Sequence, residues 1–289
     1  PNQAEHIAYN TPKPATPLKN FFLPVRENVT SARNTGRPRI IIGVPNCDVE
    51  ALGLLDEIYM DEEFNDPFYR NRRESTILIS SDCYSVNDHC HCTSYGVKPY
   101  SMANADMALL SDGDVIHLRV ITGRGEEFSK QLTSVFAGDG SDHLRYAEKR
   151  HQEAEAMLAD RNKGLPDYKT TGEIVQKAGA RIWAKYASKC VSCGACTTIC
   201  PTCSCFLLID KPDFAKVKQM DACQYPGFAR VAGGEDALFH LPDRFRNRYM
   251  CKYVWKPQKF HSLACTGCGR CIEACIGKIS KNELFMELI

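Results

Sequence analysis

Short apolar runs and polar breaks alternate over residues 37 to about 140, and this pattern predicts strands connected by turns. The β-branched run at 40–44 and the run at 76–80 are typical of buried strands. Two further apolar segments, 107–110 and 115–120, flank a Ser-Asp-Gly-Asp sequence that favours a hairpin turn. A small α/β domain is the simplest arrangement of these strands with the helix described next.

Helical periodicity follows the first predicted strand. Pro45-Asn46 ends that strand, and apolar residues then recur at helical spacing, at Val49, Leu52, Leu55 and Tyr59. Residues 143–160 are helical by composition. Gly164-Leu165-Pro166 ends that segment, and we place a domain boundary there.

Two more helices are predicted beyond this boundary. The first is expected to be continuous and to face the core through a stripe of residues four apart: Ile174, Ala178, Ile182 and Tyr186. The second is a short C-terminal helix over 282–289 that docks through its apolar residues. The segment between these helices is dominated by cysteines and does not follow either periodicity.

The first 36 residues differ from the rest of the chain. Pro12, Pro14, Pro17 and Pro24 are incompatible with a regular helix, so we expect an extended arm over residues 1–36. The arm could be a strap lying over the surface of the domain, or it could dock a partner.

Composition narrows the class of protein. The chain has 289 residues, is 44% hydrophobic and 25% charged, and has a formal net charge of +1. A nucleic-acid-binding protein would show a basic stripe, and no apolar run approaches the roughly 18 residues of a membrane span. Sixteen cysteines are too many for a chain of this length to need as disulfide staples. They indicate metal centres in a reducing, cytoplasmic compartment.

Two cysteine motifs have the spacing of bacterial ferredoxins, C-x2-C-x2-C-x3-C. The first motif is followed by Pro201, whereas Ile276 stands where the second would usually have proline, which changes the local turn but removes no ligand. In this pattern the fourth cysteine of each motif ligates the other cluster. The two predicted [4Fe–4S] ligand sets are Cys190, Cys193, Cys196 and Cys275, and Cys265, Cys268, Cys271 and Cys200.

Zinc is the main alternative metal, because thiolates bind both zinc and iron–sulfur clusters. Structural zinc sites normally use two C-x2-C pairs and need neither the third cysteine nor the x3 spacing. Two copies of the full spacing therefore favour clusters. The predicted fold class is α+β, with an α/β domain at 37–165 and a helical domain at 166–289. The second domain carries the ferredoxin-like module, with a long insert at 201–264.

Eight further cysteines form two groups of four, the number that a cubane needs. The first group comprises Cys47, Cys83, Cys90 and Cys92, and the second comprises Cys203, Cys205, Cys223 and Cys251. In the first group, Cys47 and Cys83 follow the two predicted strands, whose ends would meet if the strands are parallel neighbours. Cys47 would also lie at a helix N-terminus, which favours an anionic cluster. The alternatives are buried thiols, a redox-active Cys90/Cys92 pair, or metal ligation by His89 and His91.

The other motifs in the sequence give only weak evidence of function. Cys196, Cys200 and Cys203 have the C-x3-C-x2-C spacing of radical enzymes that cleave S-adenosylmethionine, but here it lies inside the ferredoxin motif. Gly123-Arg124-Gly125 lacks the third glycine of a dinucleotide fingerprint, and the chain has no nucleophile elbow, Walker A loop or HExxH helix. The basic stretch Arg244, Arg246 and Arg248 is either a solvated or ion-paired loop, or a patch that offsets cluster charge or binds an acidic partner.

The chain resembles the iron–sulfur β subunit of cytosolic sulfhydrogenases and the iron–sulfur subunit of anaerobic sulfite reductase. The resemblance rests on the first motif and its extension through Cys205-Phe206, and it covers roughly residues 18–280. Further matching stretches are Gly43–Asp48, Cys90–Cys92, Asp221–Gln224, Val231–Gly234, Asp243–Tyr249 with Cys251-Lys252, and Cys265–Cys271; Asn20–Phe22, Pro24, Arg26, Glu27, Leu54–Asp56, Tyr69 and Arg72-Arg73 also match. Members usually start further upstream, so we expect additional sequence before Pro1.

The resemblance implies an electron relay in a cytoplasmic, anaerobic, multisubunit oxidoreductase of hydrogenase or sulfite reductase type. Such proteins pair with a flavin subunit that holds FAD and a [2Fe–2S] cluster and oxidises NAD(P)H, and they pass electrons toward a catalytic redox subunit. The resemblance also suggests that the chain binds more than two clusters. We find no separate substrate-converting site in this chain. Two other hypotheses stay open, a catalytic subunit with a substrate-binding cluster in the N-terminal domain and a free-standing ferredoxin-like carrier.

Overall fold

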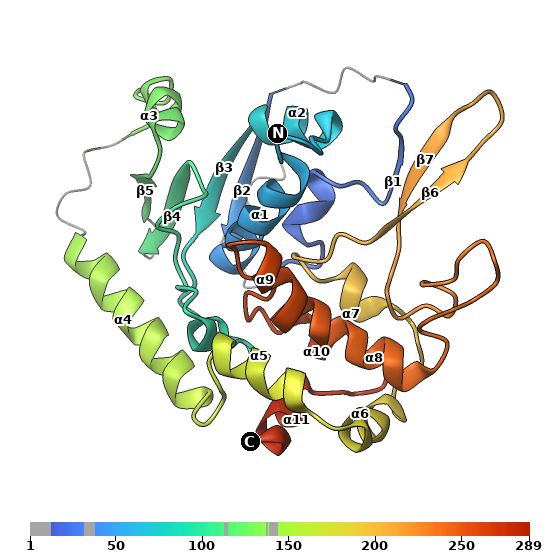
Figure 1. The fold of residues 1–289 in the computed structure, drawn as a ribbon. Coiled ribbons are helices and arrows are strands. Elements are labelled where there is room, and N and C mark those ends of the chain that lie inside the picture. The colour runs from blue at the N-terminus through green and yellow to red at the C-terminus, as the bar shows by residue number, and fades with distance from the viewer. Residues whose placement is uncertain (1–12, 32–37, 113–114, 137, 139–143) are drawn as a thin grey trace.

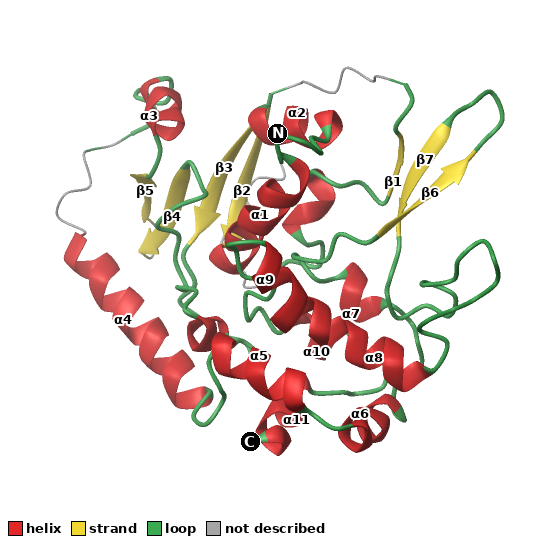
Figure 2. Cartoon of the chain, in the orientation of Figure 1, coloured by secondary structure: helices red, strands yellow, loops and turns green. Residues whose placement is uncertain are grey.

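The computed structural model describes residues 13–31, 38–112, 115–136, 138 and 144–289. The fold is mixed α+β, with two small sheets and helices around them (Figures 1 and 2). The first sheet has the strand order β2-β3-β4-β5. Its strands are β2 (Arg39–Pro45), β3 (Thr76–Ser81), β4 (Met107–Asp112) and β5 (Val115–Val120).

The first sheet confirms the predicted strands and corrects one detail. β2, β3 and β4 run parallel, and β5 returns antiparallel to β4 as the predicted hairpin. The run at 40–44 was expected to be a buried strand, but Ile40 and Ile42 are about half exposed. The reason is that the strand alternates: Ile41 packs against the core beside α1, whereas Ile40 and Ile42 point to the opposite, exposed face of this edge strand.

Two helices pack beside this sheet. α1 (Asn46–Tyr59) begins directly after β2, and α2 (Pro67–Glu74) precedes β3. The predicted helical stripe is confirmed, because all four of its residues are buried: Val49, Leu52, Leu55 and Tyr59. They form a core with Tyr69 of α2 and Leu78 of β3.

The described part of the N-terminal arm lies against this core. A 3-10 turn, η2 (Leu18–Phe21), leads to Phe22 and Leu23, and Leu18, Phe22 and Leu23 are all buried beside α1. The arm then forms β1 (Arg26–Asn28), which pairs antiparallel with β7 (Lys216–Met220). β7 pairs in turn with β6 (Phe206–Asp210), so the arm completes a second sheet in the insert. The described part of the arm therefore lies across the rest of the chain as a strap.

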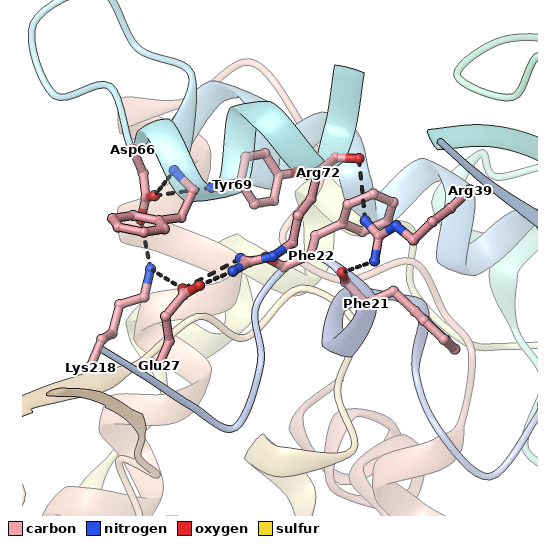
Figure 3. Close-up of polar contacts among 9 residues, drawn as sticks. Phe21, Phe22, Glu27, Arg39, Asp66, Tyr69, Arg72 and Lys218 are labelled. Carbon is pink, nitrogen blue, oxygen red and sulfur yellow. Dashed lines mark hydrogen bonds and ion pairs between the residues drawn. The ribbon is translucent and has the colours of Figure 1, made fainter. Parts of the chain in front are cut away.

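A network of buried charges holds the arm, α2 and the insert together (Figure 3). Arg72 of α2 forms an ion pair with Glu27 of β1, and both side chains are less than 10% exposed. Lys218 of β7 lies 3.8 Å from Glu27 and 2.6 Å from Asp66, which also caps the N-terminus of α2. The network therefore joins three segments that are far apart in the sequence.

The chain then passes through α3 (Gly123–Lys130), α4 (Leu144–Arg161), α5 (Tyr168–Lys177) and α6 (Ala180–Ala187). α4 confirms the helix predicted from composition. The single helix predicted across 174–186 is wrong, because the chain is extended at Ala178 and α6 restarts after Gly179. Glycine has low helix propensity, and the break lets both halves pack inward. The expected core role of the stripe is nonetheless met, since all four residues pack in the C-terminal core.

The remaining helices lie in the C-terminal part of the chain, which contains the cysteine motifs (Figure 1). They are α7 (Ala195–Thr198), α8 (Leu241–Met250), the π-helical turn η5 (Cys251–Trp255), α9 (Lys256–Lys259), α10 (Arg270–Glu273) and α11 (Lys281–Leu288). α11 confirms the predicted C-terminal helix, with Leu284 and Phe285 buried. The β6–β7 hairpin shows that the region expected to be helical also contains strands. No described helix is long and apolar enough to cross a membrane.

The predicted boundary at 164–166 falls in the loop between α4 and α5. The packing across it is extensive, because Tyr95 of the N-terminal region lies in the same core cluster as Trp183, Tyr253 and Phe285. The division into an arm, an α/β domain and a cluster domain stays a prediction.

Candidate functional site

The two ferredoxin-type motifs fold as structural repeats. Gly194 and Gly269 each adopt a positive φ, 72° and 74°, immediately before the four-residue helices α7 and α10. The hydrogen bond that opens each short helix is the same in the two loops. Thr197 N donates to the Gly194 carbonyl and Ile272 N donates to the Gly269 carbonyl, both at 2.9 Å. A side chain at either glycine would be strained, so the sequence C-G-x-C suits this turn.

Each repeat contributes to two neighbouring cavities. The first cavity is lined by Cys190, Cys193, Cys196 and Cys275. The second cavity is lined by Cys200, Cys265, Cys268 and Cys271. The fourth cysteine of each motif thus faces the cavity of the other motif, because α7 and α10 pack against each other. Cys271 also lines the first cavity, so the two cavities lie side by side.

The spacing of the thiols does not suit a single metal ion. A zinc–sulfur distance of about 2.3 Å places the sulfurs of a tetrahedral zinc site about 3.8 Å apart. Among the described residues, no three His, Cys, Asp or Glu side chains converge closely enough to hold one ion. Four thiols around a hollow, by contrast, are the donor set of a [4Fe–4S] cluster.

Three buried cations face these cavities, and they give an independent test of what the cavities hold. Arg248 of α8 and Lys281 of α11 line both cavities, and Lys252 of η5 lines the second. All three residues are less than 5% exposed. None forms an ion pair with a carboxylate among the residues that the structure describes. Buried cations need a balancing charge, and a [4Fe–4S]2+ core with four thiolates has a net charge of about −2.

The pKa values of Lys252 and Lys281 result from the opposing effects of burial and of the nearby cysteine sulfurs. Burial by itself lowers the pKa of Lys252, but the nearby cysteine sulfurs, Cys200 first, together raise it by more, so the pKa lies well above its ordinary value. Burial and then Cys265 act in the same opposing way on the pKa of Lys281, which is raised. Lys281 Nζ lies 3.7 Å from Cys265 Sγ. Both lysines are therefore protonated beside the second cavity.

Backbone N–H groups also point at the sulfurs. Ser192 N donates to Cys190 Sγ at 3.4 Å, and Ile279 N donates to Cys275 Sγ at 3.3 Å. Bonds of this kind stabilise anionic sulfur and tune the potential of a cluster.

The cysteines of the first additional group also come together. Cys47, Cys83, Cys90 and Cys92 line a third cavity, which Gly267 and Cys268 of the second motif share. The expected cause is confirmed: β2 and β3 are parallel neighbours, and they deliver Cys47 and Cys83 to the same edge of the sheet. All four cysteines are free thiols in the structure.

In the second additional group, two cysteines pair with each other and a third pairs with a cysteine outside the group. Cys205 and Cys223 share a hydrogen bond, which raises the pKa of Cys205 and lowers that of Cys223 to about 5. Cys203 shares a hydrogen bond with Cys200 of the second cavity. Cys251 lies at the start of η5 and interacts electrostatically with Cys205.

Of the two candidate histidine ligands, His91 is held by hydrogen bonds within the protein. His91 is fully buried, its Nδ1 lies 2.7 Å from the His89 carbonyl oxygen and its Nε2 lies 2.7 Å from Lys281 Nζ. Since Lys281 donates to Nε2, Nδ1 carries the proton and donates to His89. Both ring nitrogens are thus engaged within the protein. Burial, with Lys281 next, lowers the pKa of His91 well below its ordinary value.

Sequence reasoning found one of the three buried cations. The basic stretch at 244–248 was noted, and the structure buries Arg244 and Arg248, which are four residues apart on α8. Arg248 lines the cavities, as the charge-offsetting interpretation expects. Lys252 and Lys281 were not singled out. The only signal for Lys252 is its place after Cys251, and nothing near Lys281 in the sequence marks it as buried.

The loop of the second ferredoxin-type motif packs tightly against the segment that contains Cys90 and Cys92. A Cβ on Gly269 would lie 2.3 Å from the His89 carbonyl oxygen, and one on Gly267 would lie 2.5 Å from the Cα of Cys92. His91 N donates to the Gly267 carbonyl at 2.9 Å. These close contacts fix the position of the backbone segments that separate the second cavity from the third.

We expect Gly269→Ala to destabilise the protein by more than Gly227→Ala. Both glycines have a positive φ, which costs an alanine about 1–2 kcal/mol. A Cβ at Gly227 meets nothing within 4 Å, whereas one at Gly269 meets backbone. Only Gly269→Ala should also reduce the iron content, measured per chain after anaerobic purification. Equal effects of the two changes would contradict the packing argument.

Comparison with known proteins identifies a family for the segment that forms both cavities. Residues 189–279 match the 4Fe-4S dicluster domain family. The chain is also 30% identical over 304 positions to a protein of Pyrococcus furiosus, sulfhydrogenase 2 subunit beta. That similarity covers 99% of this chain and 87% of the relative. The dicluster match contains all eight cysteines of the first and second cavities.

Proposed function

Since the chain belongs to the sulfhydrogenase β-subunit family, we propose that it relays electrons between a catalytic redox subunit and an NAD(P)H-oxidising flavin subunit. The family match makes it an iron–sulfur subunit of an oxidoreductase complex, and the dicluster domain implies two [4Fe–4S] clusters. The catalytic subunit would be of hydrogenase or sulfite reductase type. Sixteen free cysteines suit a reducing cytoplasm.

The ligand assignment follows the two cavities. One cluster would be held by Cys190, Cys193, Cys196 and Cys275, and the other by Cys265, Cys268, Cys271 and Cys200. When bound, each cluster supplies one-electron redox chemistry. The residues of this chain hold the clusters next to each other, since Arg248, Cys271 and Lys281 border both cavities. This shared border is the observation that carries the proposal, because electron relays need adjacent centres.

The first cavity would be the point where electrons leave or enter the chain. Cys193 is exposed, and so is the side chain of Val191, which lines the same cavity. Cys200 and Cys265 of the second cavity are buried. A cluster with an exposed ligand is accessible to a redox partner, whereas an enclosed one is reached through its neighbour.

The proposed relay makes a direct kinetic prediction. The chain alone, purified anaerobically with at least 8 iron atoms at about four per cubane, should not oxidise NAD(P)H. Adding the flavin subunit should make the visible absorption of the clusters bleach on addition of NAD(P)H. The control is dithionite, which should bleach the chain with or without that subunit.

Two results would contradict the proposal. Near-zero iron with stoichiometric zinc would remove the redox centres altogether. Oxidation of NAD(P)H by the chain alone would make it a catalytic subunit in place of a relay.

A further inference from the structure

We propose that Cys47, Cys83, Cys90 and Cys92 hold a third [4Fe–4S] cluster, next to the cluster of the second cavity. The site is argued from the third cavity itself, and its role in electron transfer rests on the function proposed above. The four cysteines come from three separate segments of the N-terminal region, and they line one cavity with no carboxylate or histidine among its described lining residues.

The fold explains how these segments converge. Pro45 at the end of β2 pairs in register with Ser81 at the end of β3, so the two strands end side by side. Cys47 then lies in the first turn of α1, and Cys83 follows β3 by two residues. The chain returns to the same place at Cys90, which hydrogen-bonds through its carbonyl to Asn162.

The local chemistry suits an anionic cluster. Cys47 is at the N-terminal end of the 14-residue helix α1, where unpaired N–H groups and the helix dipole favour negative charge. Lys13 and Lys98 contribute cations to the lining of the cavity. Four cysteine ligands complete the coordination of a cubane and leave no iron open for substrate, which favours electron transfer over catalysis at this centre.

Plain thiols and a single-ion site account less well for this arrangement. A single ion would need at least three ligands close together, and no such group exists among the described residues. Ordinary core cysteines would pack against apolar side chains, as Cys92 does in part. Here, however, four thiols line one cavity, although protein interiors normally leave few voids.

The wall between the third and second cavities is thin. Gly267 borders the third cavity, and Cys268, a ligand of the second cavity, lines both. His91, between Cys90 and Cys92, accepts a hydrogen bond from Lys281, which in turn lies 3.7 Å from Cys265 Sγ. The centres therefore follow one another in the order third, second, first cavity, with the exposed Cys193 at one end.

The charges predict a direction along this relay. Lys13 forms an ion pair with Glu273, and Lys98 forms one with Glu155 at 2.9 Å. The cations of the first and second cavities have no such carboxylate partners among the described residues. Less positive charge is therefore left to offset a third cluster, so it should have the lowest potential of the three. In the relay, one electron passes from the reduced third cluster to the oxidised second cluster, with no bond made or broken.

The test compares iron, acid-labile sulfide and low-temperature EPR for the full chain and two variants, all purified anaerobically. Wild-type protein should contain at least about 12 iron atoms, by four per cubane. The change Cys90→Ala/Cys92→Ala should remove about four of them and one EPR signal. Signals of the two ferredoxin-type clusters should persist, which also shows that the variant folds. Ser85→Ala, at an exposed residue of the same cavity, should keep all the iron.

A second variant decides the outcome if the double change prevents folding. Cys83→Ala should lose between one and four iron atoms, and loss of a single iron should give the signal of a three-iron cluster. Wild-type iron in Cys83→Ala, or about 8 iron atoms in the wild-type protein, would overturn the third cluster and leave the proposed relay intact. Near-zero iron in the wild-type protein would overturn the relay itself.

Discussion

Replacing Lys281 by methionine is expected to lower the reduction potential of the cluster in the second cavity by about 100 mV. The ammonium group is buried and lies 3.7 Å from Cys265 Sγ, and reduction adds a negative charge to the cluster that it faces. Over about 6 Å, an effective dielectric constant of about 20 makes that attraction about 3 kcal/mol. Since 2.3 kcal/mol corresponds to about 100 mV for one charge, a shift of this order follows.

The measurement is an anaerobic redox titration of the complex followed by EPR. Lys278→Met is the matched control, because it removes the same charge from an exposed residue three positions away, where solvent screens it. Its effect should be several-fold smaller. Lys281→Arg keeps the charge and should restore most of the potential. A shift of equal size in Lys278→Met would show that overall charge, and not the buried contact, sets the potential.

Lys281 also holds the two halves of the site together, so the variant has a second expected effect. Its ammonium group donates to His91 Nε2 and to the Tyr253 hydroxyl at 3.1 Å. Methionine cannot donate to either acceptor, which leaves His91 without its partner in a buried site. The coupling between the second and third cavities should weaken in the same variant.

Replacing Arg270 by methionine is expected to cause the largest loss of stability, about 3–5 kcal/mol. Arg270 of α10 forms a bidentate ion pair with Asp48 of α1, with Nη2 donating to Oδ2 at 2.8 Å. Both side chains are at most 3% exposed. Without Arg270, the carboxylate of Asp48, the residue after Cys47, stays buried with no cation paired to it. For a chain of this size, such a loss lowers the midpoint of thermal unfolding by about 5–8 °C.

Thermal unfolding under anaerobic conditions measures this change, with circular dichroism as the signal. Lys163→Met is the control, since it breaks an ion pair with Asp160 whose side chains are both more than 70% exposed. Exposed pairs contribute about 0–1 kcal/mol. The double change Asp48→Asn/Arg270→Met should be more stable than Arg270→Met alone, because it removes the unpaired carboxylate. A double variant that is less stable than the single one would contradict the ion-pair argument.

Local patterns in the sequence were enough to place most of the elements. The stripe at Val49, Leu52, Leu55 and Tyr59 predicted α1, and the apolar runs predicted β3 and the β4–β5 hairpin. The same reasoning failed where tertiary contacts override a local pattern. The run at 40–44 looked buried but forms an edge strand, and Gly179 divides a stripe that continues across two helices.

The ligand sets of the two ferredoxin-type clusters were predictable because most of each set is local. Three cysteines within seven residues wrap one cluster, and the spacing of the fourth fixes which neighbour it reaches. The glycines of these loops belong to the same local pattern, since the turn between two ligands needs a positive φ.

The sequence by itself thus determined the kind of cofactor, the family and most secondary structure, because thiol spacing, helical period and strand period act over a few residues. Only the tertiary structure brought Cys47, Cys83, Cys90 and Cys92 around one cavity, since β2 and β3 must first pair. It also placed Lys252 and Lys281 beside the thiols, and it paired β1 of the arm with β7 of the insert. Burial and charge balance depend on segments far apart in the chain, and no local pattern encodes them.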